Sequence, residues 1–192
     1  MNDLNVNEAI HAHKEGRLKK AEELYCSILK SQPANLIVRN NFGALLITLG
    51  RLDEAAANYK KIVEIKPDNA EAYNNLGVTL FKLGKLNEVE EKYRAAIKLK
   101  PDYFEAYNNL GITLKELGKL DEAEACYRTA IELKPNYELA YNNLANTLKE
   151  LEKLDEAEAC YRTAIELKPN YVEAHNNLGI TLKELGKLDE AE

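Results

Sequence analysis

Residues 104–137 read FEAYNNLGITLKELGKLDEAEACYRTAIELKPNY, and residues 138–171 repeat 29 of these 34 positions. The same unit extends in both directions as residues 2–35, 36–69 and 70–103, and as a partial copy at 172–192. Each full copy ends on an aligned proline, namely Pro33, Pro67, Pro101, Pro135 and Pro169. A fixed period of this length indicates a stacked array, in which each repeat buries its apolar face only against its neighbours. We therefore expect a single repeat array over residues 1–192.

Each repeat contains two runs of apolar residues at helical spacing, separated by a Gly-Lys-Leu or Gly-Arg-Leu turn. In residues 104–137 the first run is Tyr107, Leu110, Leu114 and Leu117, and the second is Ala123, Tyr127, Ala130 and Ile131. Apolar residues three or four apart lie on one face of an α-helix. Each repeat is therefore predicted to be a pair of helices, and the fold class to be all-α.

Signals for the ends of helices accompany both runs. An Asp or Asn followed three residues later by Glu, which is capping-box spacing, precedes first and second helices. These pairs are Asp68–Glu71, Asp102–Glu105, Asn170–Glu173, Asp121–Glu124, Asp155–Glu158 and Asp189–Glu192. A glycine such as Gly118 ends the first helix where left-handed backbone is suited. Glu152 takes that place in the fifth repeat, and we expect a cost of about 1 kcal/mol there if φ stays positive.

With position 1 at residues 2, 36, 70, 104, 138 and 172, the repeats share an aromatic residue at position 4 and Leu-Gly at positions 7 and 8. They also share Ala at 20, an aromatic at 24, Ala at 27 and Pro at 32. This pattern, which covers residues 2–192, resembles the tetratricopeptide repeat (TPR) family. Departures are Leu at position 11 (Leu80, Leu114 and Leu148) and His175 at position 4. The resemblance implies a right-handed superhelical solenoid of antiparallel helix pairs, whose first helices line a concave groove.

The residues that face this groove follow from helical geometry. At about 100° per residue, positions 3, 4, 7, 11 and 14 cluster as the core face, and positions 2, 5, 6, 9, 12 and 13 fall on the opposite arc. A repeat array binds partners through its continuous curved surface, so we expect function on this arc.

Asparagine fills two columns of the arc, which together hold 11 of the 20 Asn in the chain. The position-6 residues are Asn7, Asn41, Asn75, Asn109, Asn143 and Asn177, and the position-5 residues are Asn40, Asn74, Asn108, Asn142 and Asn176. A side-chain amide can both donate to and accept from a peptide bond. Such a column is therefore predicted to hold an extended chain by its backbone, without reading its sequence.

The columns resemble the asparagine ladder in the TPR superhelix of O-linked N-acetylglucosamine transferases, where the amides grip the substrate backbone. Two alternatives remain. The amides could bond to neighbouring helices and stabilise stacking, or near-identical duplication could simply have copied them.

The same arc carries seven apolar residues in the first three repeats. They are Val6, Ile10, Ile37, Ala44, Ile47, Val78 and Phe81, whereas positions 12 and 13 become Lys-Glu in repeats 4 to 6. Clustered exposed apolar groups are candidate hot spots, so we predict Ile47, Val78 and Phe81 as ligand anchors. The alternative is that superhelical curvature or self-association covers them.

Composition and motifs exclude several other classes of function. The net charge of −6 argues against binding nucleic acid, and the chain has no apolar run long enough to span a membrane. No secretory signal is visible and the three Cys form no disulfide framework, so we expect a cytoplasmic protein without a membrane partner. His11 and His13 point about 200° apart on a helix, which disfavours a shared metal. We expect no cofactor, no metal site and no catalytic residues.

The sequence thus predicts a non-catalytic module that binds an extended peptide or partner segment in the concave groove. The alternative function is the substrate-recruiting arm of a larger glycosyltransferase or sulfotransferase, with the catalytic domain beyond residue 192. A homo-oligomer through an uncapped C-terminal end is also expected to be possible, because Ile180, Leu182 and Leu185 have no following repeat to cover them. The chain ends inside a second helix, as a segment cut from a longer array would.

Overall fold

The computed structural model describes residues 2–187, and side chains from Val6 onward. Within these residues it contains eleven α-helices and no strand. The first helices of the repeats are α1 (Asn2–Lys14), α3 (Leu36–Thr48), α5 (Ala70–Lys82), α7 (Phe104–Glu116), α9 (Glu138–Glu150) and α11 (Val172–Glu184). The second helices are α2 (Leu18–Ser31), α4 (Leu52–Ile65), α6 (Leu86–Leu99), α8 (Leu120–Leu133) and α10 (Leu154–Leu167).

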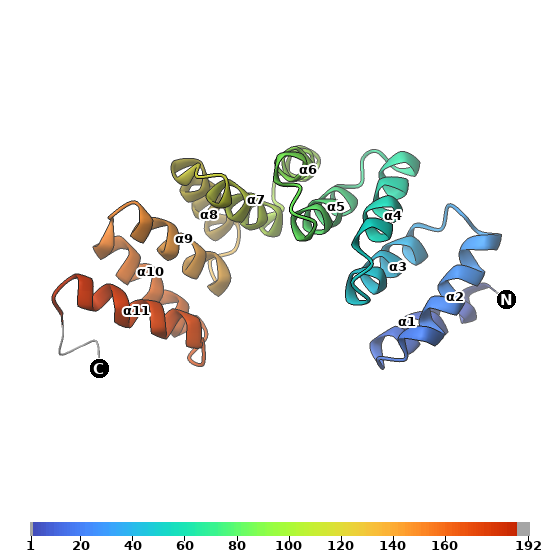
Figure 1. Ribbon diagram of the computed structural model, residues 1–192, viewed down its shortest axis with the longest axis horizontal. Helices are drawn as coiled ribbons and strands as arrows, with labels where there is room; N and C mark the ends of the chain where they lie inside the picture. Colours follow the sequence, from blue (N-terminus) through green and yellow to red (C-terminus); the bar gives the residue numbers. More distant parts are fainter. Residues whose placement is uncertain (1, 188–192) are drawn as a thin grey trace. The chain divides into compact units, whose positions relative to one another are not determined.

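The helices form two compact units, one up to Leu99 and the other from Lys100. Unit 1 holds α1–α6 and unit 2 holds α7–α11. In each unit the two helices of a repeat pack side by side as an antiparallel pair, and each second helix also packs on the first helix of the next repeat (Figure 1). The predicted all-α fold of helix pairs is confirmed.

The core of each pair is built from small residues and leucines of the first helix against a tyrosine of the second. In the fourth repeat Ala106, Leu110 and Leu114 are buried with Tyr127. Burying one such side chain fully stabilises the fold by about 1.5–3 kcal/mol relative to leaving it exposed. Positions 3, 7 and 11 therefore lie in the core as predicted, whereas positions 4 and 14 are only half-buried.

The core also includes position 8, and in the repeats that carry glycine there the ring of the tyrosine leaves no room for a side chain. A Cβ added to Gly111 would lie 2.6 Å from Cε1 of Tyr127, and one added to Gly77 would lie 2.7 Å from Cε1 of Tyr93. Real Cβ atoms do not approach so closely, so glycine allows the two helices to pack against each other here. The fifth repeat carries Ala145 at this position, and it is fully buried.

Position 10 is buried although its residue is polar. Thr113 on α7 has no exposed surface, and its hydroxyl donates to the carbonyl of Asn109 at 3.0 Å. Because that bond lies within the helix, threonine can enter the core without an unpaired hydroxyl. Thr79, Thr147 and Thr181 do the same in their helices.

The helices begin at different residues from those the capping-box spacing predicts, so that prediction is wrong. Helix α5 begins at Ala70, and the Oδ1 of Asn69 accepts the N–H of Ala72 at 3.1 Å as its N-cap. First helices α7 and α11 follow Tyr103 and Tyr171, and second helices begin at a leucine. The Asp and Glu of each pair therefore lie one residue out of register or already inside the helix, where acidic groups favour the N-terminal dipole. Asp189 and Glu192 lie outside the described residues.

The turn that ends the first helix is the same with glycine and with glutamate. Gly118 has φ +73°, and Glu152 has φ 60°, which confirms the positive φ expected there. Lys153 donates its N–H to the carbonyl of Leu148 at 2.9 Å, matching Lys119 to Leu114 at 2.8 Å. The repeat therefore imposes the left-handed turn on Glu152 despite the steric cost of its Cβ.

Candidate functional site

The candidate site is the part of the first helices that the second helices leave uncovered. We call positions 2, 6, 9, 12 and 13 the first-helix face, since these residues are exposed or half-buried along α3, α5, α7 and α9. Position 6 belongs to it. Asn41, Asn75, Asn109, Asn143 and Asn177 are half-buried, and Asn7 is exposed.

The position-6 amides bond to the preceding first helix. The Nδ2 of Asn75 on α5 donates to the Oδ1 of Asn40 on α3 at 3.0 Å. The Nδ2 of Asn143 on α9 donates to the Oδ1 of Asn108 on α7 at 2.9 Å. The alternative interpretation, in which the amides join neighbouring helices, is therefore confirmed at these two junctions. Asn41 differs, because its Nδ2 donates to the carbonyl of Ile37 in its own helix at 2.8 Å.

Position 5 is buried on α5, α7 and α9, so the predicted exposure is wrong there, whereas Asn40 is half-buried and Asn176 is exposed. Asn74, Asn108 and Asn142 are 7%, 3% and 1% exposed. For Asn108 and Asn142 the reason lies in stacking within unit 2, because α9 packs on α7 and α11 packs on α9. In unit 2 the covering side chain is Glu173, whose Oε1 accepts the Nδ2 of Asn142 at 3.0 Å. Ligand binding by Asn74, Asn108 and Asn142 stays a prediction, and it would require displacing such contacts.

The bond to the preceding helix also orients the position-6 amide. Because the Nδ2 of Asn143 is turned to Asn108, its Oδ1 is turned away from that bond. Within the described part of the chain this oxygen has no hydrogen-bond partner. One amide can therefore serve the stacking of the helices and still present an acceptor, so the two interpretations of the asparagine column are compatible.

The junction between α9 and α11 breaks the pattern. Asn177 at position 6 donates not to Asn142 but to the Oδ1 of Asn146, at 3.0 Å. The hydroxyl of Tyr161 on α10 donates to the same oxygen at 2.6 Å. The buried Oδ1 of Asn142 is consequently left without a partner among the described residues. Sequence reasoning missed Asn146, although its place at position 9, where neighbouring repeats carry Ile112 and Ile180, was a visible signal.

The apolar part of the first-helix face lies on α3 and α5. Ile37 is 64% exposed, while Ile47, Val78 and Phe81 are half-buried. These side chains are accessible, as predicted for anchors, but no ligand contact tests that role. They offer apolar surface that a partner could cover.

Val6 and Ile10 do not belong to this apolar surface, so the prediction is wrong for them. Both pack against the core cluster that includes Ala9 and Tyr25. In α1 the leucine position is taken by Glu8, whose carboxylate instead pairs with Lys20 at 2.6 Å. Val6 and Ile10 therefore supply apolar contact that the leucine of other repeats provides.

Ion pairs cross the first-helix face of unit 2. Lys115 on α7 pairs with Glu150 on α9 at 2.7 Å, and Lys149 pairs with Glu184 on α11 at 3.2 Å. In both pairs the lysine at position 12 thus meets the glutamate at position 13 of the next repeat. This predicted mixed-charge wall is locally neutral, and it carries no excess of either sign toward a ligand.

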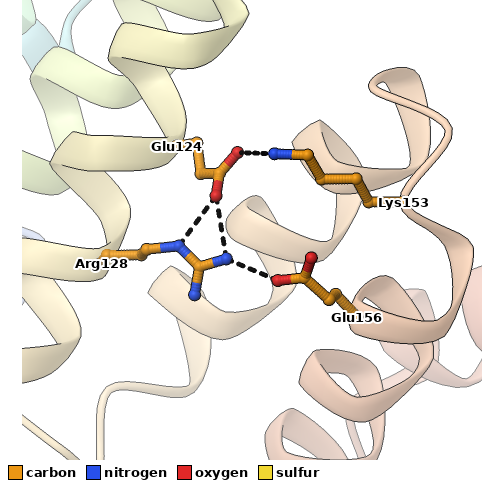
Figure 2. A network of polar contacts seen from close by, with 4 residues as sticks. All are labelled: Glu124, Arg128, Lys153 and Glu156. Atoms are coloured by element: carbon orange, nitrogen blue, oxygen red, sulfur yellow. Dashed lines mark hydrogen bonds and ion pairs between the residues drawn. The ribbon is translucent and has the colours of Figure 1, made fainter.

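A second network ties the second helices together on the outer side. The carboxylate of Glu124 on α8 accepts from Arg128 Nε at 2.9 Å and from Lys153 Nζ at 2.8 Å, and Arg128 reaches Glu156 on α10 at 2.7 Å (Figure 2). The hydrogen bond from Lys153 is the main reason that the pKa of Glu124 is held below its usual value. Glu158 bonds to Lys187 at 2.6 Å in the same way. These contacts join the second helices of successive repeats, and they do not form a reactive site.

The remaining chemically reactive side chains are scattered. Cys26, Cys126 and Cys160 are half-buried thiols outside any disulfide. Burial raises the pKa of Cys160 to about 11, which makes its thiolate scarce at neutral pH. His11 pairs with Glu15 at 3.0 Å, and His13 packs edge-on against Tyr25. The described residues contain no cluster of metal-ligating groups and no helix that could cross a bilayer.

Comparison with known sequences agrees with this architecture. A TPR repeat profile matches residues 43–84, 79–118 and 145–186, and tetratricopeptide repeat profiles match residues 104–137 and 126–159. The chain belongs to the tetratricopeptide repeat family. TPR arrays are protein-interaction modules. A search among curated proteins finds no relative of the chain.

Solved TPR structures share the fold. MamA is 29% identical with a TM-score of 0.72, over 78% of this chain and 87% of that chain. PilW, a widely conserved type IV pilus biogenesis factor, is 22% identical with a TM-score of 0.88, over 99% and 88% of the two chains. YrrB, described as a TPR protein with an unusual peptide-binding site, is 22% identical with a TM-score of 0.71, over 91% and 90%. The last two likenesses show the TPR fold alone.

The last described helix of the array exposes less apolar surface than predicted. Ile180 is 47% exposed, but Leu182 is 2% exposed and Leu185 is half-buried. The expectation of an open face is therefore correct for Ile180 and wrong for Leu182, which packs into its own repeat. Association of two chains through this helix stays a prediction.

Proposed function

We propose that this TPR array is a non-catalytic module that binds an extended peptide segment on the first-helix faces of its repeats, the faces expected to line a concave groove. The observation that carries the proposal is the orientation of the position-6 amides. The Nδ2 of Asn143 donates one hydrogen to Asn108, so its second hydrogen and its Oδ1 are left for a ligand. Such a group can bond to the backbone of a ligand whatever its sequence.

The stacking bond makes these amides better binding groups than free surface asparagines. A side chain that is already held in one rotamer loses little further freedom when a ligand binds. The position-6 column therefore offers oriented polar groups on half-buried side chains. YrrB, a protein with the same fold, is described as having a peptide-binding site, which agrees with this use of the fold.

Unit 1 is proposed to add apolar anchors. Ile37, Ile47, Val78 and Phe81 line α3 and α5, while unit 2 offers a neutral row of ion pairs at the corresponding positions 12 and 13. A ligand whose side chains toward unit 1 are aliphatic or aromatic would bury this surface. A segment bound by unit 1 is therefore expected to combine polar backbone contacts with apolar side chains.

The proposal is tested by panning an unbiased displayed-peptide library with the whole chain. We expect enriched peptides that are bound at least roughly tenfold more weakly by the Asn75→Ala, Asn109→Ala and Asn143→Ala variants, the loss expected of one hydrogen bond or more. Glu132→Ala, at an exposed position on α8, is the control and should leave affinity unchanged. Absence of any enriched peptide, or equal binding by all four variants, would overturn the proposal.

Phe81→Ala tests the apolar anchor in the same assay. Affinity for selected peptides should fall by about tenfold, whereas the melting temperature should drop less than for a fully buried phenylalanine, which costs about 3–5 kcal/mol when truncated. A large loss of stability with unchanged affinity would show that Phe81 serves the core instead.

A further inference from the structure

Asn146 on α9 is the polar exception in the position-9 row of the array. The equivalent residues are Ala44, Val78, Ile112 and Ile180. Asn146 is half-buried, and its carboxamide oxygen accepts two hydrogen bonds, from the Tyr161 hydroxyl at 2.6 Å and from the Asn177 Nδ2 at 3.0 Å. Two donors on one side of the amide fix its rotamer and decide which end is oxygen.

Because the oxygen of the Asn146 amide is held, the Nδ2 group at its other end has two donor hydrogens in a fixed orientation. With the oxygen occupied, the two hydrogens of Asn146 Nδ2 point away from Tyr161 and Asn177. Within the described part of the chain neither hydrogen has an acceptor, and position 9 belongs to the first-helix face. A half-exposed donor that is held in place and left unpaired is ready to bind an acceptor oxygen.

Asn143 lies three residues earlier on the same helix and presents the complementary group. Its amide is fixed by the bond to Asn108, with the oxygen unpaired. Residues three apart on a helix are neighbours on its surface, with Cβ atoms about 5–6 Å apart. Helix α9 therefore carries one fixed acceptor and one fixed donor side by side, a combination that an aliphatic residue at position 9 cannot make.

We propose that Asn143 and Asn146 form a two-point clamp for one residue of an extended peptide. The oxygen of Asn143 accepts the peptide N–H, and the Nδ2 of Asn146 donates to the peptide C=O. In an extended chain both groups of one residue point to the same side, as they do in the hydrogen-bonded pairs of antiparallel strands. Because donor and acceptor are not interchangeable, the clamp places one peptide residue in register at α9, whereas the position-6 column alone permits sliding.

Holding Asn146 in this way leaves one buried polar atom of the described core without a hydrogen bond. Recruiting Asn177 to hold Asn146 leaves the Oδ1 of Asn142 buried without a donor among the described residues. At α3–α5 and α7–α9 the position-6 amide satisfies the position-5 oxygen instead. The fifth repeat thus lacks the hydrogen bond to Asn142 and has a fixed Nδ2 donor on Asn146 instead. A local loss of stability that orients a surface group is typical of a binding residue.

The inference rests on the proposed function, and its test uses peptides selected by the whole chain from the displayed library. Asn146→Ile restores the residue found at Ile112 and Ile180, and Asn146→Asp keeps the shape but removes the donors. Both variants should bind roughly tenfold more weakly, the effect of one hydrogen bond. The melting temperature is measured alongside, because Asn146→Ile removes the acceptor of the buried Tyr161 hydroxyl while it lets Asn177 donate to Asn142. Asn146→Asp keeps an acceptor for Tyr161, so a loss of binding shared by both variants reports the missing donor. Glu166→Ala, at an exposed position on α10, is the control.

A thioamide scan of the selected peptide identifies the bonded carbonyl, since sulfur is a weak acceptor. One thioamide position should weaken binding to the wild-type chain by roughly tenfold and have no effect on binding to Asn146→Ile. Equal binding by the wild-type chain and both Asn146 variants, or a thioamide effect that persists in Asn146→Ile, overturns the clamp. If those peptides still respond to Asn75→Ala and Asn109→Ala, the proposed function stands without it. If the library yields no peptide, both fail.

Discussion

The amide of Asn143 on α9 donates to the amide oxygen of Asn108 on α7 at 2.9 Å. The donor residue is half-buried on the first-helix face, whereas the acceptor residue is 3% exposed between the helices. At this junction one asparagine column therefore satisfies the other, and a surface residue of α9 is bonded to a buried residue of α7. Asn75 and Asn40 form the same bond in unit 1.

Removing the donor should destabilise the chain. Asn143→Ala leaves the buried Oδ1 of Asn108 without its partner, and we expect a loss of about 1–3 kcal/mol in the free energy of unfolding. Urea unfolding followed by circular dichroism measures it. Asn41→Ala is the matched control, since Asn41 donates within its own helix, and it should change stability by less than about 0.5 kcal/mol. Equal losses would show that the bond between helices contributes nothing.

The close approach of Gly111 to Tyr127 predicts how two opposite substitutions at position 8 change stability. Gly111→Ala places a Cβ against the ring of Tyr127 and should cost about 1–3 kcal/mol through overpacking. Ala145→Gly, at the equivalent position of α9, should instead cost about 1 kcal/mol, because it introduces glycine into a helix that already accommodates alanine. Thermal unfolding of both variants tests this, and a stabilised Gly111→Ala protein would contradict the packing argument.

The left-handed turn after α9 offers a stabilising substitution. Glu152 has φ 60°, so Glu152→Gly should raise the free energy of unfolding by about 1 kcal/mol. Gly118→Ala is the converse control. Gly118 has φ +73° and open space around its Cα, so its substitution should lower stability by a similar amount through the backbone alone. Chemical denaturation measures both, and changes of the same sign would refute the assignment of strain.

The network around Glu124 predicts a dependence on pH. Hydrogen bonds, first from Lys153, hold the pKa of Glu124 below its usual value, so its contribution to stability is complete above the ordinary glutamate pKa of about 4.3. The contribution is lost as the pH falls through the lower pKa of the folded state. The difference in melting temperature between the wild-type chain and Glu124→Gln should therefore shrink on acidification.

Glu132→Gln provides the control for this pH experiment, because Glu132 is exposed on the same helix. Its melting temperature should follow that of the wild-type chain at every pH. A difference for Glu124→Gln that stays constant from neutral to acid pH would show that the ion pairs do not stabilise the repeat.

Much of the fold could be predicted because its signals are local and repeated. The spacing of Leu110, Leu114 and Tyr127 defines which faces of two helices meet, and the glycine at 118 marks the turn between them. Even Glu152 obeys the repeat, because the hydrogen bonds of neighbouring residues impose its backbone conformation. Periodicity determines such features without knowledge of distant contacts.

The candidate site could be predicted only in part, since an angle on a single helix does not say what covers it. The position-6 column was placed correctly on the uncovered face, but on α7 and α9 position 5, which the same calculation placed beside it, is buried where the next first helix packs. Val6 and Ile10 were assigned to the surface for the same reason, although they are half-buried and pack against the core cluster around Tyr25.

The sequence by itself determined the helix pairs, their turns and the family, because each depends on residues within one 34-residue period. Only the tertiary structure decided how the asparagines are used. The choice of Asn177 between Asn142 and Asn146 depends on the Tyr161 hydroxyl and on the stacking of α9 against α11, contacts that join three helices. A hydrogen bond between side chains far apart in the sequence has no local signature, and it became visible only when the helices were brought together.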